Sequence, residues 1–239
     1  MEDILSKFVD NVKIIYGLNL KSVVLYGSKA SGEDTKKHSD NNILLILDDI
    51  KFSDLKSLNK IIKFWTKKGN QPPLIFTTEQ FRKSADVFPI EFLDMKDNHK
   101  ILYGEDPLEN LEIGNTHLRH ECEFELKGKL LKLRQGYVAS RNKSDIKNLL
   151  VNSITSFLIL FRHIIRLFNE TPPTKRLDAL NILSKKTGLN QSVFINIFNM
   201  KQGNSQALKL DQESVIEEYL KEIEKIVDVV DDIDNEIVS

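Results

Sequence analysis

The sequence is poor in cysteine, and this restricts the kinds of site that the chain can build. Cys122 is its only cysteine. A disulfide within the chain needs two cysteines, and a zinc cluster held by thiolates needs several. Both kinds of site are therefore excluded.

The sequence also lacks an excess of charge of either sign. It has 34 Lys and Arg against 35 Asp and Glu, for a net charge of −1 at pH 7. A protein that holds a nucleic-acid backbone needs basic surface to bind the phosphates. We therefore do not expect nucleic acid as a partner, and a small-molecule or protein acceptor fits better.

No apolar run is long and uninterrupted enough to suggest a membrane span. The first eleven residues contain acidic side chains and show helical spacing, where a signal peptide would have a basic end and an apolar core. Arginine in a bilayer costs several kcal/mol, so the most apolar window is expected to be a buried helix. We expect a cytoplasmic protein. The polar residues within that window, Leu149–Phe168, are Asn152, Arg162, His163 and Arg166.

With 239 residues, 41% of them apolar and 29% charged, the chain has the composition of a soluble globular protein of one or two domains. Two short apolar runs joined by a polar segment stand out. Val23–Tyr26 ends at Gly27 and Ser28, and Ile43–Leu47 follows Ser39-Asp40-Asn41-Asn42. Apolar runs of this length bounded by turn residues predict buried strands, here paired as a hairpin.

The residues at the ends of these strands are suited to a triphosphate and its metal. Gly27 has no Cβ, so backbone N–H groups can approach phosphate oxygens closely, and Ser28 adds a hydroxyl donor. Alternation along a strand places Asp40 and Asn42 on the same side, roughly 6 to 7 Å apart. Oxygen ligands there are of the kind that Mg²⁺ prefers and shares with substrate phosphates.

The pattern resembles the signature of the nucleotidyltransferase superfamily of polymerase-β type, in particular bacterial aminoglycoside and minimal nucleotidyltransferases. Gly27-Ser28 is followed by a ten-residue spacer, by Ser39-Asp40-x-Asn42 and by an apolar strand. The family pattern has Ser-Asp-x-Asp, so Asn42 departs from it at the second metal-binding aspartate. The loss of one charged ligand is expected to weaken catalysis by several kcal/mol of transition-state stabilisation.

The resemblance implies Mg²⁺ as cofactor and a nucleoside triphosphate, with ATP the expected one, as substrate. It places Asp40 and Asn42 at the metal. Lys29 beside the phosphate site can steer a triphosphate by charge, although a solvated loop explains it equally well. The residues implied to contact the nucleotide on this side are Gly27, Ser28, Lys29 and Ser39.

A third carboxylate is expected on a neighbouring strand. We predict a strand over Phe88–Met95, in which alternation places Glu91 on one face and Asp94 on the other. A carboxylate within an apolar strand is costly to bury without a partner. The resemblance implies a third metal-binding carboxylate, and Glu91 is assigned to it and to general-base catalysis. The alternatives are an exposed edge-strand glutamate and Asp94 in the same role.

The rest of the first half alternates helix and strand signals. Helical spacing predicts helices over residues 4–16 and Phe52–Lys68, and Leu74–Phe76 predicts a short strand. A brief helix capped by Thr77 or Thr78 follows. Residues 99–103 and 104–107 are expected to form a short turn of helix and a loop.

Beyond residue 115 there is almost no strand signal, and several long helices predict an up-and-down bundle. The fold class is therefore α+β, a small mixed-sheet nucleotidyltransferase domain at 1–114 followed by an all-α bundle domain at 115–239. Arg162 and Arg166 lie four residues apart in an apolar helix, where arginine generally has an anionic partner. We assign both to the nucleotide, with Arg134 and Arg141 as the other candidates in this half of the chain. The helices are expected at Leu118–Val138, Ile146–Phe168, twice between Lys175 and Phe198, and at Ser214–Ile233.

Two functions of different class follow. In the first, the protein is an Mg²⁺-dependent nucleotidyltransferase that moves a nucleoside monophosphate from a triphosphate to a hydroxyl of an aminoglycoside-like small molecule or of a protein. In the second, the loss of a carboxylate at Asn42 leaves a catalytically impaired fold that acts as a nucleotide-binding or protein-interaction module. The sequence leaves the oligomeric state open, with a homodimer as one candidate.

Overall fold

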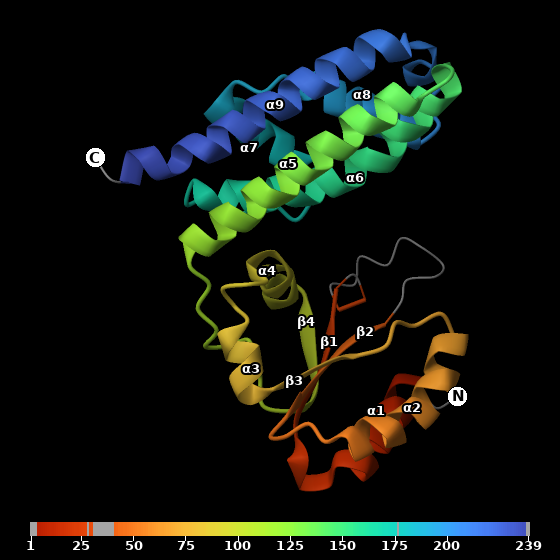
Figure 1. The fold of residues 1–239 in the computed structure, drawn as a ribbon, viewed down its shortest axis with the longest axis vertical. Helices are drawn as coiled ribbons and strands as arrows, with labels where there is room; N and C mark the ends of the chain where they lie inside the picture. Colours follow the sequence, from red (N-terminus) through yellow and green to blue (C-terminus); the bar gives the residue numbers. More distant parts are fainter. Residues whose placement is uncertain (1–3, 28, 31–40, 176, 238–239) are drawn as a thin grey trace. The chain divides into compact units, whose positions relative to one another are not determined.

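The computed structural model describes residues 4–27, 29–30, 41–175 and 177–237. The chain divides into two compact units, Met1–Ile113 and Gly114–Ser239. The first contains a sheet with helices, and the second consists of helices (Figure 1).

The first unit is built on a four-stranded mixed sheet with the strand order β3-β2-β1-β4. β1 pairs antiparallel with β2 and with β4, whereas β2 and β3 run parallel. The hairpin predicted from the two apolar runs is therefore confirmed, with Val24 opposite Leu44. The strands are β1 (Leu20–Tyr26), β2 (Asn42–Leu47), β3 (Leu74–Thr77) and β4 (His99–Gly104).

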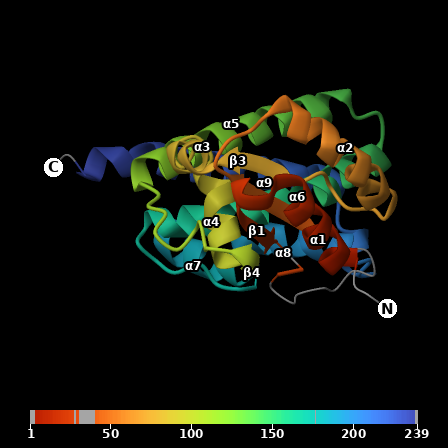
Figure 2. The same ribbon diagram turned by 90° about the horizontal axis from the view of Figure 1, so that it is seen from below.

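Helices cover both faces of this sheet, as Figures 1 and 2 show. α1 (Ile4–Tyr16) and α2 (Phe52–Lys67) pack with Val23 and Leu45 on one face. α3 (Thr78–Lys83), α4 (Pro89–Asp97) and the segment 105–113 pack on the other, with Val24 and Leu44. Successive strand residues alternate between two apolar cores, so β1 and β2 carry apolar side chains on both faces. A short 3₁₀ helix, Gly17–Asn19, precedes β1.

Trp65 on α2 is at the centre of one of these cores. Its side chain is 1% exposed, and its ring lies 4.3 Å from that of Phe8 on α1. The indole Nε1–H donates to the carbonyl oxygen of Gln71 at 2.7 Å, which satisfies the one polar atom of the side chain. This residue therefore joins α1, α2 and the segment that leads into β3.

The strand expected over Phe88–Met95 is a helix, and this prediction was wrong. Pro89 begins α4, where the lack of an N–H is harmless because the first helical N–H groups have no partner within the helix. Phe92 and Met95, three residues apart, face the core together. The fourth strand is instead β4, over residues where a turn of helix and a loop were expected.

The second unit is the predicted helical bundle. α6 is its central helix and contacts α5, α7, α8 and α9. Edge-to-face ring pairs join Phe157 and Phe161 of α6 to Phe194 of α8 and Tyr219 of α9. The helices are α5 (Asn115–Ala139), α6 (Lys143–Leu167), α7 (Asp178–Thr187), α8 (Gln191–Lys201) and α9 (Gln212–Ile237), with a 3₁₀ turn at Ala207–Lys209.

Within the described part of the chain, α6 alone is long and apolar enough to span a membrane by length and composition. Half of its most apolar window is buried inside the structure, and four other helices contact it. This is the environment of a core helix in a bundle.

Candidate functional site

The structure brings Gly27 and Asn42 together at one end of the β1–β2 hairpin. Tyr26 lies directly opposite Asn42 in the antiparallel register. Gly27 has φ +81°, a left-handed conformation that favours glycine. A Cβ on Gly27 would lie 3.1 Å from Nδ2 of Asn42. The Asn42 amide therefore lies in the space into which a side chain at position 27 would project.

Two backbone hydrogen bonds hold the turn that begins at Gly27. The Gly27 N–H donates to the carbonyl of Asn98 at 2.9 Å, and the N–H of Ala30 donates to the carbonyl of Gly27 at 2.9 Å. Lys29 is half-buried within this turn. Ser28, Ser39 and Asp40 lie outside the described residues, so their roles at the phosphates and the metal stay predictions.

A buried amide network fixes the residue that directly follows Asp40. Asn41 and Asn70 are each 7% exposed. The Oδ1 of Asn70 accepts from the backbone N–H of Asn41 at 3.0 Å and from its Nδ2 at 2.9 Å. The Nδ2 of Asn70 in turn donates to the carbonyl of Trp65 at 3.3 Å. The start of β2 is thereby attached to the end of α2.

Replacing Asn70 with alanine is expected to destabilise the protein by about 1–3 kcal/mol, because it leaves buried donors of Asn41 without an acceptor. Urea denaturation measures this as a lower midpoint with an unchanged slope. Asn59 on α2 is exposed, so Asn59→Ala is the matched control and should leave the midpoint almost unchanged. Equal effects of the two substitutions would contradict the role of the network.

Tyr26, Asn42 and His99 form a row across three strands. Tyr26 is opposite Asn42 on one side and His99 on the other, and directly opposite residues share a face of the sheet. Tyr26 is partly buried, which raises the pKa of its hydroxyl and keeps it neutral near pH 7. The row lies on the face that α3 and α4 cover.

His99 connects this row to Asp106. Its Nε2 lies 2.9 Å from Oδ2 of Asp106, and its Nδ1 lies 3.2 Å from the carbonyl oxygen of Lys96. A carboxylate and a carbonyl only accept hydrogen bonds, so each ring nitrogen of His99 lies beside an acceptor. Sequence reasoning missed His99 and Asp106, because the segment was not expected to be a strand and nothing in its spacing marks the pair.

Glu91 does not lie on a strand beside β1. It belongs to the first turn of α4 and is exposed. β4, the strand that does pair with β1, is His-Lys-Ile-Leu-Tyr-Gly and carries no carboxylate. The strand position from which a metal-binding and general-base role was inferred for Glu91 therefore does not exist. Among the residues that the structure describes, no group of three His, Cys, Asp or Glu side chains could hold a metal ion.

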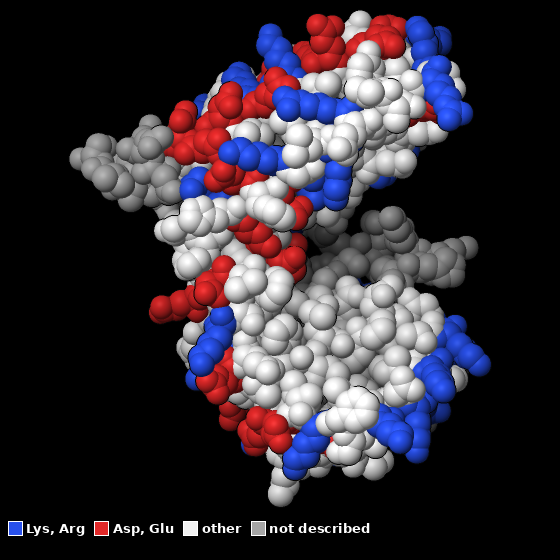
Figure 3. Space-filling view, viewed as in Figure 1, with Lys and Arg blue, Asp and Glu red and all other residues white. Residues whose placement is uncertain are grey.

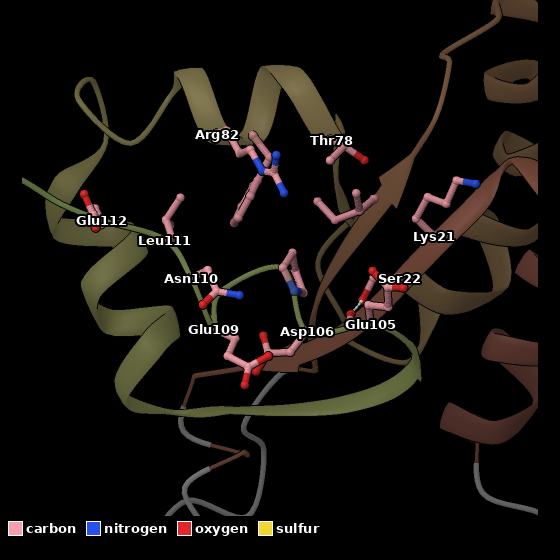
Figure 4. A pocket seen from close by; sticks show the side chains of 13 residues that line it. Lys21, Ser22, Thr78, Arg82, Glu105, Asp106, Glu109, Asn110, Leu111 and Glu112 are labelled. Atoms are coloured by element: carbon pink, nitrogen blue, oxygen red, sulfur yellow. Dashed lines mark hydrogen bonds between the residues drawn. The ribbon is translucent and has the colours of Figure 1, made fainter.

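A hollow of about 550 Å³ lies on the same face of the sheet, toward the start of β1 (Figure 4). Ser22 of β1 lines it and donates from Oγ to the carbonyl of Glu105 at 2.7 Å. Ser22 precedes Gly27 by five residues, roughly 16 Å along the strand. Asp106 also lines the hollow and contacts His99, so the hollow extends toward the row of Tyr26, Asn42 and His99. Its charged and polar lining residues include Arg82, Glu105, Asp106, Glu109, Asn110 and Glu112.

Arg162 and Arg166 lie on α6, in the other compact unit from Gly27. Within that unit, the Nε of Arg162 donates to the carbonyl of Pro173 at 3.1 Å, which orients its guanidinium group. Both side chains are half-buried. Their assignment to the nucleotide stays a prediction.

No protein-family model matches this sequence, and no curated protein matches it. A solved structure is similar, the spectinomycin adenyltransferase AAD(9) from Enterococcus faecialis with ATP and spectinomycin. The similarity covers 92% of this chain and 98% of that chain, with a TM-score of 0.56 and 13% sequence identity. The similarity shows that the chain shares the fold of this nucleotidyltransferase, including both the sheet unit and the helical unit.

Proposed function

We propose that the protein is a nucleotidyltransferase that moves a nucleoside monophosphate from a triphosphate to a hydroxyl group. The proposal rests mainly on one observation. The two ends of the predicted signature meet in the structure, with the position of a Gly27 Cβ 3.1 Å from Nδ2 of Asn42. They do so on a fold shared with an adenyltransferase that was solved with ATP.

The residues of the turn supply the phosphate contacts in this proposal. Backbone N–H groups after Gly27 and the hydroxyl of Ser28 donate to phosphate oxygens, as in other glycine-containing anion sites. Nδ2 of Asn42 faces the Gly27 turn, so the amide is also placed to donate to a phosphate. His99 lies in the same row and is oriented by its contact with Asp106.

Magnesium fits this site in part. Asp40 offers a carboxylate and Asn42 an amide oxygen, both of the oxygen type that Mg²⁺ accepts, and Mg²⁺ often takes only one or two protein ligands. Bound there, the ion would neutralise phosphate charge. Asn42 supplies no negative charge, and Glu91 lies on α4 rather than on a strand beside β1. We therefore propose Asp40 as the principal ligand.

The acceptor in this proposal is the hydroxyl of a small molecule. The adenyltransferase with the same fold was solved with spectinomycin, which supports an aminoglycoside-like acceptor. The near-neutral charge of the chain is consistent with a small acceptor rather than a nucleic acid. We place the protein in the cytoplasm, where nucleoside triphosphates are available.

A second candidate function has its own support. Asn42 replaces a charged ligand, and β4 offers no carboxylate as general base beside β1. A protein with these two features can bind a nucleotide without turning it over. In this reading the protein is a nucleotide-binding or protein-interaction module.

Binding of a nucleotide is common to both functions and is tested first. Each of the four nucleoside triphosphates with Mg²⁺ is added at millimolar concentration, and the melting temperature is measured. A triphosphate at a hundred times its dissociation constant should stabilise the folded state by about 2.7 kcal/mol. Absence of a shift with all four would contradict nucleotide binding in either form.

Asp40 and Glu91 are distinguished by a matched pair of substitutions. We expect Asp40→Ala to weaken Mg²⁺-dependent nucleotide binding at least about tenfold, since it removes the principal ligand of the ion. Glu91→Ala should change the affinity by less than about twofold, because Glu91 is exposed on α4. Isothermal titration with and without Mg²⁺ measures both. The reverse order of effects would show that the site is not at the Gly27 turn.

A further inference from the structure

The outer face of α2 carries a row of exposed lysines. Leu58 and Trp65 mark the opposite face of this helix, which is buried in the core of the sheet unit. The lysines recur at intervals of four, three and four residues, so they fall within an arc of about 60° and form a line about 16 Å long. The residues of this lysine row are Lys56, Lys60, Lys63 and Lys67.

The lysine row is not neutralised by carboxylates. None of the positions three or four residues before or after each lysine holds Asp or Glu. On other helices such pairs are present, as between Lys83 and Glu79 on α3 and between Lys127 and Glu123 on α5. Among the ion pairs that the described residues form, none involves a lysine of the row. Like charges at this spacing destabilise a helix, so the row does not serve the stability of α2.

Large apolar side chains are exposed next to the lysine row. Phe52 and Phe64 on α2 are 82% and 58% exposed, and helical spacing places them on either side of the row. Leu18, which is 96% exposed, precedes Asn19. The Asn19 side chain donates to the carbonyl of Asp49 at 2.8 Å and accepts from its N–H at 2.9 Å. The segment that carries Leu18 is thereby held against the segment that leads into α2.

Charge and exposed apolar groups together indicate the chemistry of a partner for this face. Residues 51–68 contain six lysines and a single carboxylate, Asp54. Figure 3 shows basic side chains gathered at the edge of the sheet unit where Figure 1 places α1 and α2. A complementary partner is polyanionic and accepts apolar side chains, and a bilayer with anionic headgroups offers both. The aliphatic Leu18 favours a bilayer over a nucleic-acid strand, whose bases stack on aromatic rings.

We propose that the outer face of α2 docks on the surface of a bilayer that contains anionic phospholipids. The lysine row lies along the headgroups, and Phe52 and Leu18 enter the boundary between headgroups and acyl chains. This is peripheral binding by a folded unit, and it requires no membrane span. Leu18 precedes β1 whereas Gly27 follows it, so the apolar contact lies at the far end of the strand from the candidate site.

Co-sedimentation of the full chain with lipid vesicles tests the docking. Vesicles of phosphatidylcholine with about 40% phosphatidylglycerol should bind the protein at least about tenfold more tightly than vesicles of phosphatidylcholine alone. Added salt should weaken the binding, because it screens the headgroup charge. Absence of binding to the anionic vesicles at about 1 mM lipid, or equal binding to both compositions, would overturn the proposal.

A pair of matched variants tests the lysine row. K60E/K63E should weaken binding to anionic vesicles at least about 25-fold, since each lysine near such a surface contributes about fivefold. Each new glutamate lies four residues from another lysine of the row, a spacing at which opposite charges stabilise a helix, so the variant should fold. The control, K132E/K185E, makes the same change at two exposed lysines of the helical unit and should bind like the parent. Equal losses would show dependence on net charge alone and overturn the proposal.

Two further measurements identify the bilayer as the partner. Phe52→Ser removes an exposed ring that the core does not need, and should weaken vesicle binding at least about fivefold without lowering the melting temperature. Unchanged binding would overturn the entry of this side chain into the bilayer. Binding of a single-stranded RNA of about 20 nucleotides is measured in parallel. Tighter binding to the RNA than to the vesicles, lost in K60E/K63E, would assign the row to nucleic acid and overturn the proposal.

Discussion

The variant Asn42→Asp is expected to bind Mg²⁺ and a nucleoside triphosphate at least about tenfold more tightly than the parent protein. The substitution changes almost no volume and adds one negative charge at a position that adjoins the Gly27 turn. A tenfold change corresponds to about 1.4 kcal/mol, a small part of what a charged ligand contributes to a dication site. Isothermal titration with Mg²⁺ and each triphosphate measures the change.

A control and a second measurement make this result decisive. Asn110→Asp adds the same charge in the same unit, at an exposed residue of the segment between β4 and α5, and should leave nucleotide binding unchanged. Transfer of label from the triphosphate to a panel of aminoglycosides or to protein is measured in parallel. If Asn42→Asp raises transfer, the enzyme reading is supported. Tighter binding without transfer supports the binding module. Weaker binding would mean that Asn42 is not at the metal.

Gly104→Ala is expected to be the most destabilising single substitution of a glycine in the sheet unit, at roughly 4 kcal/mol. Gly104 has φ +76° and lies opposite Ser22 at the end of β4. A Cβ there would lie 1.8 Å from the carbonyl oxygen of Lys21, a distance that forces the backbone apart. The left-handed conformation contributes about 1–2 kcal/mol and the displacement about 1–3 kcal/mol.

Gly69→Ala separates these two contributions. Gly69 has φ +84°, and a Cβ on it would meet no atom within 4 Å. We therefore expect a loss of only about 1–2 kcal/mol, from the backbone conformation alone. Denaturant titration of both variants gives the difference. Equal losses would show that the close approach of Gly104 to Lys21 is absent in solution.

The sequence predicts the sheet hairpin and most of the helices because the pattern of apolar residues in each fits only one kind of secondary structure. Val23–Tyr26 and Ile43–Leu47 are short, apolar and bounded by turn residues. In the long helices, apolar side chains recur at intervals of three and four residues. The capping of α3 was also predictable, since Thr77 and Gln80 form a reciprocal capping box.

The exchange of helix and strand at α4 and β4 has a specific cause. The segment Phe-Pro-Ile-Glu-Phe-Leu-Asp-Met is short enough to fit both the two-residue period of a strand and the 3.6-residue period of a helix. Periodicity alone therefore cannot decide between the two elements. Pro89 was the informative signal, because proline is common at the first position of a helix. β4 itself is an edge strand whose half-exposed side chains give only a weak alternation.

Only part of the candidate site could be found from the sequence. Gly27 and Asn42 were identified because the constraints on them are local, a turn at one strand end and an alternating position at the other. Asn70 and the His99–Asp106 pair were not identified, because each forms a hydrogen bond with a residue that only the fold brings close. Tertiary hydrogen bonds of this kind have no characteristic residue spacing in the sequence.

The position of Trp65 gives the molecule a built-in optical probe. It is the single tryptophan of the chain, and it is packed against Phe8 in the core of the sheet unit. Its carbonyl also accepts the Asn70 hydrogen bond that leads to Asn41, beside Asp40. Tryptophan emission therefore reports on the sheet unit and the start of β2, whereas far-ultraviolet circular dichroism is dominated by the helices of the bundle. The two signals, recorded in one experiment, follow the two halves of the chain separately.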